Sequence, residues 1–397
     1  MKIAHRVSLI KPSATLAMSA KAKALAAEGI PVIDFGVGEP DFDTPEIVKE
    51  SGIEAIRAGF TKYTAPGGID SLKMAILKQF EKEKGLVYER SEILISCGAK
   101  HSLYNIAQAL FEKGDEVIIP SPYWVSYPDQ VLLNEATPVF LPTREEEGFL
   151  IDPERLQKAI TSRTKALIIN TPSNPTGAAL TRQNLSAIAE VVLRNRVLVI
   201  FDEIYEKIIY DGFEHVTFPA LLPGLRDLTL IVNGVSKSYS MTGWRIGYTI
   251  GPKEIIKAME VLQSQSTSNP CSISQKAAVT AIESGAPFTR TMVREFDIRR
   301  RYMVDRLNRI KGVRCTMPKG AFYAFPHVAS LFGRRGPTGS VRNSIDLAGY
   351  LLETAHVAVV AGEPFGAYSY VRLSYATSME NITGGLDRIE KALNNLT

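Results

Sequence analysis

Short apolar runs alternate with longer helical patterns between residues 92 and 250. Several of these runs are apolar at every position, which is typical of parallel strands covered by helices on both faces. They predict strands at 92–96, 116–119, 139–141, 166–170, 197–202, 229–233 and 245–250. Helical periodicity predicts helices at 100–111, 153–160 (with Asp152 as N-cap) and 182–195. The alternation predicts an α/β fold with a large, mostly parallel sheet domain covered by helices.

The pattern changes after residue 285. We predict a long charged helix over 289–309, followed by short strands and helices at 320–325, 345–356, 357–360 and 370–374, with a glycine-rich loop at 333–339. This mixture is typical of a smaller α+β domain. We therefore expect a large domain at 50–285, and a second unit formed by the N-terminal arm (1–49) and the small domain (286–397). Acidic neighbours of Arg299, Arg300 and Arg301 favour a solvated helix face for these three arginines.

Composition narrows the classes of function. The chain of 397 residues is 45% hydrophobic and 22% charged, as in ordinary globular enzymes. No apolar run is long enough for a membrane span, and the N-terminus lacks the pattern of a signal peptide, so we expect a cytoplasmic protein without membrane contact. Basic residues form no stripe that would bind nucleic acid. The three cysteines and five histidines are scattered, so we expect no metal site.

Polar or unusual residues recur at the ends of the predicted strands. In an open parallel sheet, ligands bind outside the carboxyl ends of the strands. The residues that the sequence delivers to this edge are Gly98 and Ala99, Trp124, Asn174, Asp202 and Tyr205, Ser236 and Lys237, and Arg245. Because they come from separate segments and converge on one edge, they predict a functional site there.

Lys237 is the most informative of these residues. By itself it would be a surface lysine at a strand end. Desolvation or a nearby cation lowers the pKa of a lysine amine and makes it a nucleophile toward an aldehyde. Arg245, eight residues further on, could supply such a charge and could also bind a phosphate through its planar fork.

The stretch around Lys237, GVSKSYSMTGWRIG at 234–247, resembles the lysine signature of class I pyridoxal-phosphate aminotransferases. Other blocks resemble the same family in the same order: VGEPDF at 37–42, KYT at 62–64, SPYW at 121–124, NPTG at 174–177, DEIY at 202–205 and VRLSY at 371–375. The likeness covers essentially the whole chain. It is closest to the bacterial-type aspartate aminotransferases, including members that also accept prephenate. It implies a fold-type I enzyme, pyridoxal 5'-phosphate as cofactor, and a homodimer with composite active sites.

The resemblance also implies roles for single residues around the cofactor ring. Lys237 would hold the cofactor as a Schiff base and then carry the proton of the substrate α-carbon. Asp202 would pair with the protonated pyridine nitrogen, Tyr205 and Asn174 would face the phenolic oxygen, and Trp124 would stack on the ring. Each has a plainer interpretation when taken alone: a helix cap for Asp202, a turn residue for Asn174, and core packing for Tyr205 and Trp124.

A second group of residues would hold the cofactor phosphate. Gly98, Ala99 and Lys100 lie at the start of a predicted helix, and the backbone amides at a helix N-terminus attract anions. Arg245 would add a guanidinium, and Tyr63 would reach the phosphate of the neighbouring subunit. Some aminotransferases carry a phosphate-binding serine three residues before the lysine, where this chain has Gly234; Ser236 is the nearest hydroxyl that could replace it.

Substrate binding is the third implied role. Arg372 would clamp the α-carboxylate through a bidentate pair, and the loop at Gly38 would close over the substrate. Lys100 and Lys11 are candidates for the distal carboxylate, although both are also plausible as solvated lysines. We expect amino transfer between L-aspartate and 2-oxoglutarate first, and use of prephenate or an aromatic oxo acid second.

The sequence leaves two alternatives to an aspartate aminotransferase. The first is a carbon–sulfur lyase or synthase, because the same fold hosts such enzymes and they share the lysine. The second is a transcriptional regulator built on an aminotransferase-like domain, but the stretch before Gly38 is too short for a DNA-binding module.

Overall fold

A computed structural model describes residues 3–10, 12, 14–337 and 339–397. Its central feature is a seven-stranded sheet with the order β2-β8-β7-β6-β5-β3-β4. The strands are β2 (Ile93–Ser96), β3 (Glu116–Ser121), β4 (Thr137–Pro142), β5 (Thr164–Asn170), β6 (Leu198–Asp202), β7 (Thr229–Gly234) and β8 (Gly247–Ile250). All neighbours pair in parallel except β8, which is antiparallel to β7 and to β2. The predicted α/β fold with a mostly parallel sheet is confirmed.

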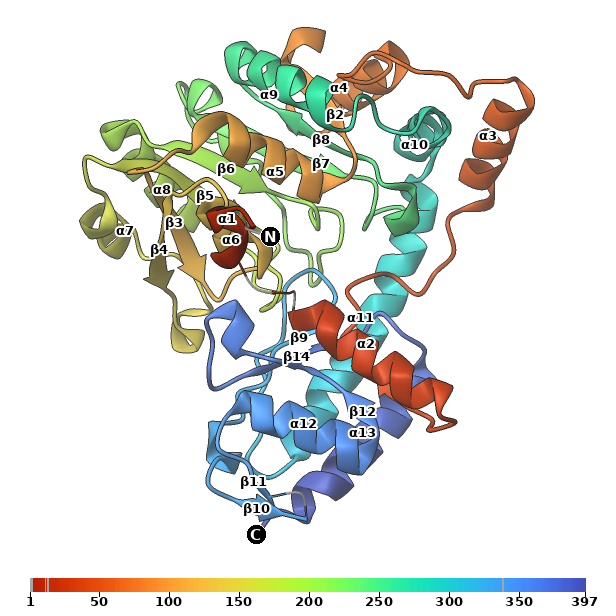
Figure 1. The fold of residues 1–397 in the computed structure, drawn as a ribbon, viewed down its shortest axis with the longest axis vertical. Coiled ribbons are helices and arrows are strands. Elements are labelled where there is room, and N and C mark those ends of the chain that lie inside the picture. The colour runs from red at the N-terminus through yellow and green to blue at the C-terminus, as the bar shows by residue number, and fades with distance from the viewer. Residues whose placement is uncertain (1–2, 11, 13, 338) are drawn as a thin grey trace.

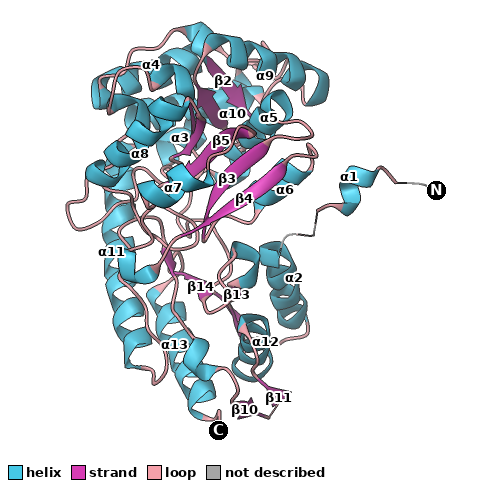
Figure 2. Cartoon of the chain, turned by 90° about the vertical axis from the view of Figure 1, so that its left-hand side faces the viewer, coloured by secondary structure: helices cyan, strands magenta, loops and turns pink. Residues whose placement is uncertain are grey.

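Helices cover both faces of this sheet (Figures 1 and 2), because alternate residues of each strand are apolar on opposite sides. In β3, Val117 and Ile119 pack with α5, α6 and α9, whereas Ile118 packs with α7 and α8 on the other face. Helices α3, α4 and α10 cover the end of the sheet that holds β2 and β8. The bounds are α3 (Glu46–Arg57), α4 (Asp70–Lys84), α5 (Ala99–Leu110), α6 (Ser126–Leu132), α7 (Pro153–Ala159), α8 (Arg182–Asn195), α9 (Lys253–Ser266) and α10 (Ser272–Ser284).

The second unit lies below the sheet in Figure 1 and is joined to it by the long helix α11 (Ala286–Arg309). It contains a three-stranded antiparallel sheet of order β13-β14-β9 and a parallel pair of β1 with β12. Its elements are β1 (Ile33–Asp34), β9 (Tyr323–Ala324), β10 (Arg335–Gly336), β11 (Gly339–Ser340), α12 (Ser344–Ala355), β12 (Val357–Ala358), β13 (Val360–Ala361), β14 (Val371–Ser374) and α13 (Met379–Asn394). The N-terminal arm carries α1 (His5–Ser8) and α2 (Ala14–Ala27). Among the residues that the structure describes, no helix is both long enough and apolar enough to cross a bilayer.

The expected solvated face of the arginine cluster on α11 is wrong for two of its three members. Arg300 is completely buried and pairs with Asp211 at 2.8 Å and with Asp297 at 2.5 Å. Arg299 is also buried, and it pairs with Asp41 at 2.7 Å. Periodicity within the helix could not reveal this, because Asp211 and Asp41 lie far away in the sequence and reach α11 only in the folded chain.

Local differences elsewhere are small. The strand expected at 245–250 begins at Gly247, because Arg245 adopts the left-handed conformation with φ 58°. The glycine-rich loop expected at 333–339 pairs as the short hairpin β10–β11. Asp152 caps α7 as expected, since its side chain accepts from the amides of Glu154 and Arg155.

Candidate functional site

A cavity of about 640 Å³ lies at the carboxyl edge of the large sheet, and the second unit contributes part of its lining. Most of the residues that the sequence predicted for the site line this cavity. The predicted residues that line it are Gly38, Ala99, Lys100, Trp124, Asn174, Asp202, Tyr205, Ser236, Lys237, Arg245 and Arg372. The convergence of separate segments on one edge of the sheet is therefore observed.

Lys237 lies three residues after the end of β7 and is half-buried in this cavity. Its Nζ donates a hydrogen bond of 2.6 Å to the carbonyl oxygen of Gly38. Burial lowers the pKa of Lys237 to about 8, the nearby Glu39 carboxylate opposes this, and the positive charges of Arg245 and Arg372 lower the pKa further. A lysine with this pKa holds an appreciable fraction of free amine near neutral pH.

Asp202 ends β6 and is almost completely buried. Its carboxylate accepts hydrogen bonds from the hydroxyl of Tyr127 at 2.6 Å and from the amide of Ile204 at 3.1 Å. Burial raises the pKa of Asp202 to about 6, although both hydrogen bonds oppose the rise. Among the described residues no salt bridge to this carboxylate is formed, although the charge of Lys237 also lowers its pKa. A buried carboxylate without a paired cation is costly, so this position suits a positively charged ligand group.

Arg372 lies in β14 and reaches the cavity from the second unit, with only about 2% of its surface exposed. Its Nη1 donates to Asn174 Oδ1 at 2.9 Å and its Nη2 to the carbonyl of Gly36 at 2.6 Å. The guanidinium lies 4.5 Å from the ring centroid of Tyr323. Among the described residues, its Nε has no hydrogen-bond acceptor. A buried guanidinium in the wall of a cavity suits an anionic ligand.

Tyr205 is buried, and its hydroxyl lies 2.7 Å from that of Tyr323. The sequence had singled out Tyr205 but neither Tyr323 nor Tyr127. Tyr127 stands three residues after Trp124, on the first turn of α6, so helical spacing could have indicated that both rings face the same cavity. No comparable signal marks Tyr323, because it enters from β9 in a distant part of the chain.

The N-terminus of α5 meets Arg245 at one corner of the cavity. Gly98 has φ 89°, and a Cβ at this position would lie 2.4 Å from Arg245 Nη2, so the position requires glycine. A Cβ on Gly247 would likewise lie 2.2 Å from the Ala99 amide nitrogen. Amides in the first turn of a helix have no acceptors within the helix. Amides and a guanidinium therefore meet at one anion-binding corner.

Gly234 occupies the position where some aminotransferases have serine. A Cβ there would lie 2.8 Å from the carbonyl of Ile246 and 3.0 Å from the Cα of Gly247. Serine would thus require the backbone of β8 to shift. Ser236 is buried and lines the cavity.

The predicted lysine and tyrosine residues outside the lysine loop differ in their relation to the cavity. The Nζ of Lys100 lies 4.9 Å from the ring of Trp124, and burial, followed by the charge of Arg245, lowers the pKa of Lys100. Tyr63 is 90% exposed and does not line the cavity of its own chain. Lys11 falls outside the described residues. Lys23 of α2, which the sequence had not indicated, also lines the cavity.

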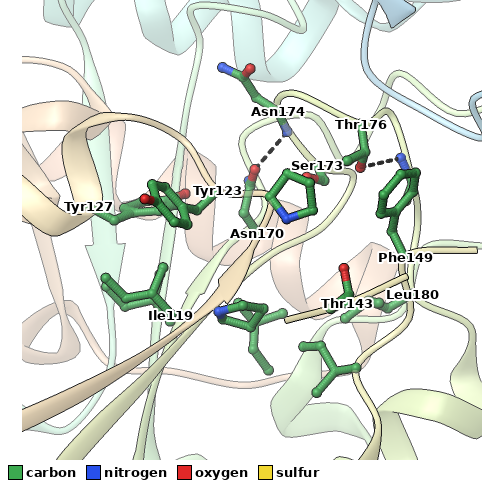
Figure 3. A pocket seen from close by; sticks show the side chains of 16 residues that line it. Ile119, Tyr123, Tyr127, Thr143, Phe149, Asn170, Ser173, Asn174, Thr176 and Leu180 are labelled. Atoms are coloured by element: carbon green, nitrogen blue, oxygen red, sulfur yellow. Dashed lines mark hydrogen bonds between the residues drawn. The ribbon is translucent and has the colours of Figure 1, made fainter. Parts of the chain in front are cut away.

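A second pocket of about 40 Å³ adjoins the cavity (Figure 3). Tyr127, Asn170 and Asn174 line both spaces. Asn170 Oδ1 accepts from the Asn174 amide at 2.9 Å, and Asn170 Nδ2 donates to the Asp202 carbonyl at 3.1 Å. This volume has room for only one or two water molecules, so it is too small to bind an amino acid.

Glu203, Glu206 and His215 form a compact buried group behind the strand that carries Asp202. No spacing in the sequence indicated this group. Lys84 donates to Glu203 at 2.6 Å and also to Glu206, so its ammonium balances one of the two negative charges. His215 and Thr217 also hydrogen-bond Glu203, and Asn233 donates to Glu206, so the two carboxylates are held by protein groups.

Comparisons with known proteins agree with this geometry. The family model "Aminotransferase class I and II" matches residues 30–389. The aspartate aminotransferase of Geobacillus stearothermophilus is 49% identical over 98% of both chains, and the aspartate/prephenate aminotransferase of Nitrosomonas europaea is 48% identical over 99% of this chain and 100% of its own. The crystal structure of the Rhizobium meliloti aspartate aminotransferase has a TM-score of 0.96 and 47% identity over 100% of both chains. The chain is therefore a pyridoxal-phosphate-dependent enzyme of fold-type I that belongs to the class I and II aminotransferases.

Proposed function

We propose that this aminotransferase moves an amino group between L-aspartate and 2-oxoglutarate in two half-reactions, at the cavity built around Lys237. The observation that carries the proposal is the meeting of Lys237, Asp202 and Arg372 in one cavity. These residues supply an amine with a lowered pKa, a buried carboxylate and a buried guanidinium.

The cavity fits pyridoxal 5'-phosphate. When bound, the cofactor supplies an aldehyde for the lysine amine and a ring that withdraws electrons from the substrate α-carbon. Asp202, which forms no salt bridge among the described residues, would face the protonated ring nitrogen, and Trp124 would stack on the ring. Tyr205 and Asn174 would donate to the phenolic oxygen. The corner formed by Gly98, Ala99, Lys100 and Arg245 would hold the phosphate, with Ser236 as a further donor.

Lys237 would carry the proton that leaves the substrate α-carbon. Its pKa of about 8 is close to neutral, which suits a group that acts first as base and then as acid. The carbonyl of Gly38, 2.6 Å from Nζ, accepts a hydrogen bond from the amine and so orients it. The second unit and the segment that contains Gly38 would exclude water from this step.

Arg372 would bind the α-carboxylate that amino acids and 2-oxo acids share. Its hydrogen bonds to Asn174 and to the Gly36 carbonyl fix the plane of the guanidinium, and each Nη carries a second N–H that could bind the ligand. Lys100 is the candidate for the distal carboxylate, Lys11 is retained as a second candidate, and Lys23 is a third cation at the cavity wall. A dicarboxylic substrate is supported by the names of the relatives and by a Thermus thermophilus aspartate aminotransferase solved with maleate, which is 41% identical with a TM-score of 0.93.

Prephenate is the second candidate substrate. Its support is that relatives from Nitrosomonas europaea and Cereibacter sphaeroides, both 48% identical, are named aspartate/prephenate aminotransferases. The carbon–sulfur lyases and synthases of the same fold are not favoured by any of these names.

We further propose a homodimer in which Tyr63 reaches the cofactor phosphate of the neighbouring subunit. The 90% exposure of its side chain, away from its own cavity, supports this role. The division into a domain at 50–285 and a unit of 1–49 with 286–397 also remains a proposal. Two apolar cores lie wholly within 50–285 and support it, whereas the core of the second unit also includes Ile204, Tyr205, Ile208 and Tyr210. A cytoplasmic location remains a prediction from the sequence.

The test is steady-state kinetics with aspartate, glutamate and prephenate against several oxo acids. We expect the highest kcat/KM for aspartate with 2-oxoglutarate. Lys237→Ala should abolish turnover, and mass spectrometry after borohydride reduction should find the cofactor on Lys237 in the wild-type protein. Full turnover by Lys237→Ala would refute the proposal.

A further inference from the structure

The segment 38–44 lies along the lysine segment 237–244. Side chains join the two segments over their whole length, although almost 200 residues separate them in the sequence. The hydrogen bonds are Lys237 Nζ to Gly38 O (2.6 Å), Thr242 Oγ1 to Glu39 Oε2 (2.7 Å), Thr44 Oγ1 to Ser240 O (2.7 Å), Trp244 Nε1 to Thr44 Oγ1 (2.9 Å), and Ser240 Oγ to Phe42 O. These hydrogen bonds therefore fix the distance between the Gly38 carbonyl and the lysine amine.

Helix α11 also contacts this segment. Arg299 Nη1 donates to Asp41 Oδ1 at 2.7 Å. The same guanidinium lies 5.2 Å from the ring centroid of Phe42 and 5.7 Å from that of Phe296, which itself packs edge-on against Phe42. Because Arg299 is only 8% exposed, solvent screens its pair with Asp41 far less than it screens a surface ion pair.

The next residue, Arg300, fixes α11 to two other segments of the chain. Arg300 donates to both carboxylate oxygens of Asp211, at 2.8 and 3.0 Å, and to the carbonyl of Pro318 at 2.6 Å. Asp211 lies in the stretch that follows Asp202 and Tyr205. Two consecutive arginines of one helix thus connect the chain segment that carries Gly38 with the chain segment that carries the Asp202 carboxylate.

We propose that Arg299 is a positioning residue of the amino-transfer reaction, which through Asp41 holds the 38–44 segment against Lys237. The inference rests on the proposed role of Lys237 as the carrier of the α-proton. Arg299 does not line the cavity, so it acts through Asp41. Without the ion pair the segment moves away from the lysine, and the amine loses the carbonyl that orients it. Misplacement of a reacting group by about 1 Å costs on the order of 100-fold in rate.

The experiment compares holoenzyme variants Arg299→Met and Asp41→Asn with the control Arg309→Met. Arg309 lies on the same helix, is exposed, and pairs with Asp305 one turn away. The measurements are amide hydrogen exchange over residues 36–44, kcat and KM for aspartate, and the kinetic isotope effect with aspartate deuterated at the α-carbon.

We expect Arg299→Met to raise exchange over residues 36–44 and to lower kcat by about 10- to 100-fold. KM for aspartate should change much less, and the isotope effect should grow because proton transfer becomes slower. Asp41→Asn should have the same effects, the double variant should add little, and Arg309→Met should behave as wild type. Asp41 is partly exposed, so its replacement tests the pair even if Arg299→Met folds poorly.

Unchanged exchange over residues 36–44 in both variants would overturn the inference, and so would raised exchange with wild-type kcat and isotope effect. If either result is obtained and Lys237→Ala is inactive, the role of Arg299 is refuted and the proposed function stands. Full turnover by Lys237→Ala would refute the proposed function as well.

Discussion

The hydroxyl of Tyr127 donates a 2.6 Å hydrogen bond to the carboxylate of Asp202, and both side chains are almost completely buried. Because the bond favours the ionised carboxylate, it limits the rise that burial causes in the pKa of Asp202, which stands at about 6. The proposed partner of Asp202 is a protonated ring nitrogen, which an ionised carboxylate stabilises and a neutral one does not. Tyr127 thereby becomes part of the proposed cofactor site.

We predict that Tyr127→Phe weakens binding of pyridoxal 5'-phosphate to the apoprotein by about 10- to 100-fold at pH 7, since a hydrogen bond to a charged group contributes about 1.5–3 kcal/mol. Affinity should fall as the pH drops through about 6, where Asp202 takes up a proton, and the midpoint should be higher in the variant. Absorbance titrations between pH 5 and 8 measure both. An unchanged midpoint in Tyr127→Phe would contradict the assignment.

Lys237 should destabilise the apoprotein at neutral pH. Its pKa falls from 10.5 in the unfolded chain to about 8 in the folded one, so the unfolded state binds more protons between these values and stability rises with pH there. Below pH 8 the folded protein retains the charged amine in a poorly solvated place. We expect Lys237→Met to raise the free energy of unfolding of the apoprotein by about 1–3 kcal/mol at pH 7, and by less at pH 9.5. Urea unfolding at the two pH values tests this; a less stable variant at pH 7 would count against it.

Arg372→Lys should raise KM for both the amino acid and the oxo acid by about 100-fold, because an ammonium cannot replace a planar fork that is already oriented by Asn174 and the Gly36 carbonyl. Cofactor absorbance should stay as in the wild type, which serves as the control. A variant with unchanged KM would show that another cation binds the α-carboxylate.

Lys100→Met should lower the activity with dicarboxylic substrates and leave the activity with monocarboxylic substrates unchanged. We expect kcat/KM for aspartate to fall by about 10-fold, the loss of one charge-assisted contact, while slow turnover of alanine stays the same. Lys23→Met is the matched comparison, since Lys23 lines the same cavity from α2. Equal losses for aspartate and alanine would place Lys100 at the cofactor phosphate instead.

Tyr63 should act across the subunit interface, and subunit mixing can test this. In a hybrid of Lys237→Ala and Tyr63→Ala chains, one site would carry both substitutions and the other would be intact. We expect a random mixture of the two inactive proteins to recover about a quarter of wild-type activity under the dimer model of shared sites. If Tyr63 serves its own chain, no activity returns on mixing.

Much of the architecture could be predicted from the sequence because the signals are local. Apolar runs such as 229–233 and 197–202 predicted β7 and β6 nearly residue by residue, and Asp152 marked the start of α7. The strand order could not be obtained in this way, since it depends on long-range pairing. Neither could the antiparallel direction of β8, which begins only after the left-handed turn at Arg245.

For the site, the sequence by itself determined the family and the candidates at the ends of the strands, because lysine, aspartate, tyrosine and arginine follow buried runs in a recognisable order. Only the tertiary structure decided the partners of these residues. Tyr127 reaches Asp202, Arg372 crosses from the second unit to Asn174, and Arg299, expected in solvent, is buried against Asp41. The reason is physical: periodicity reports which side of an element is apolar, whereas hydrogen bonds between side chains 75, 198 and 258 residues apart depend on how whole elements pack.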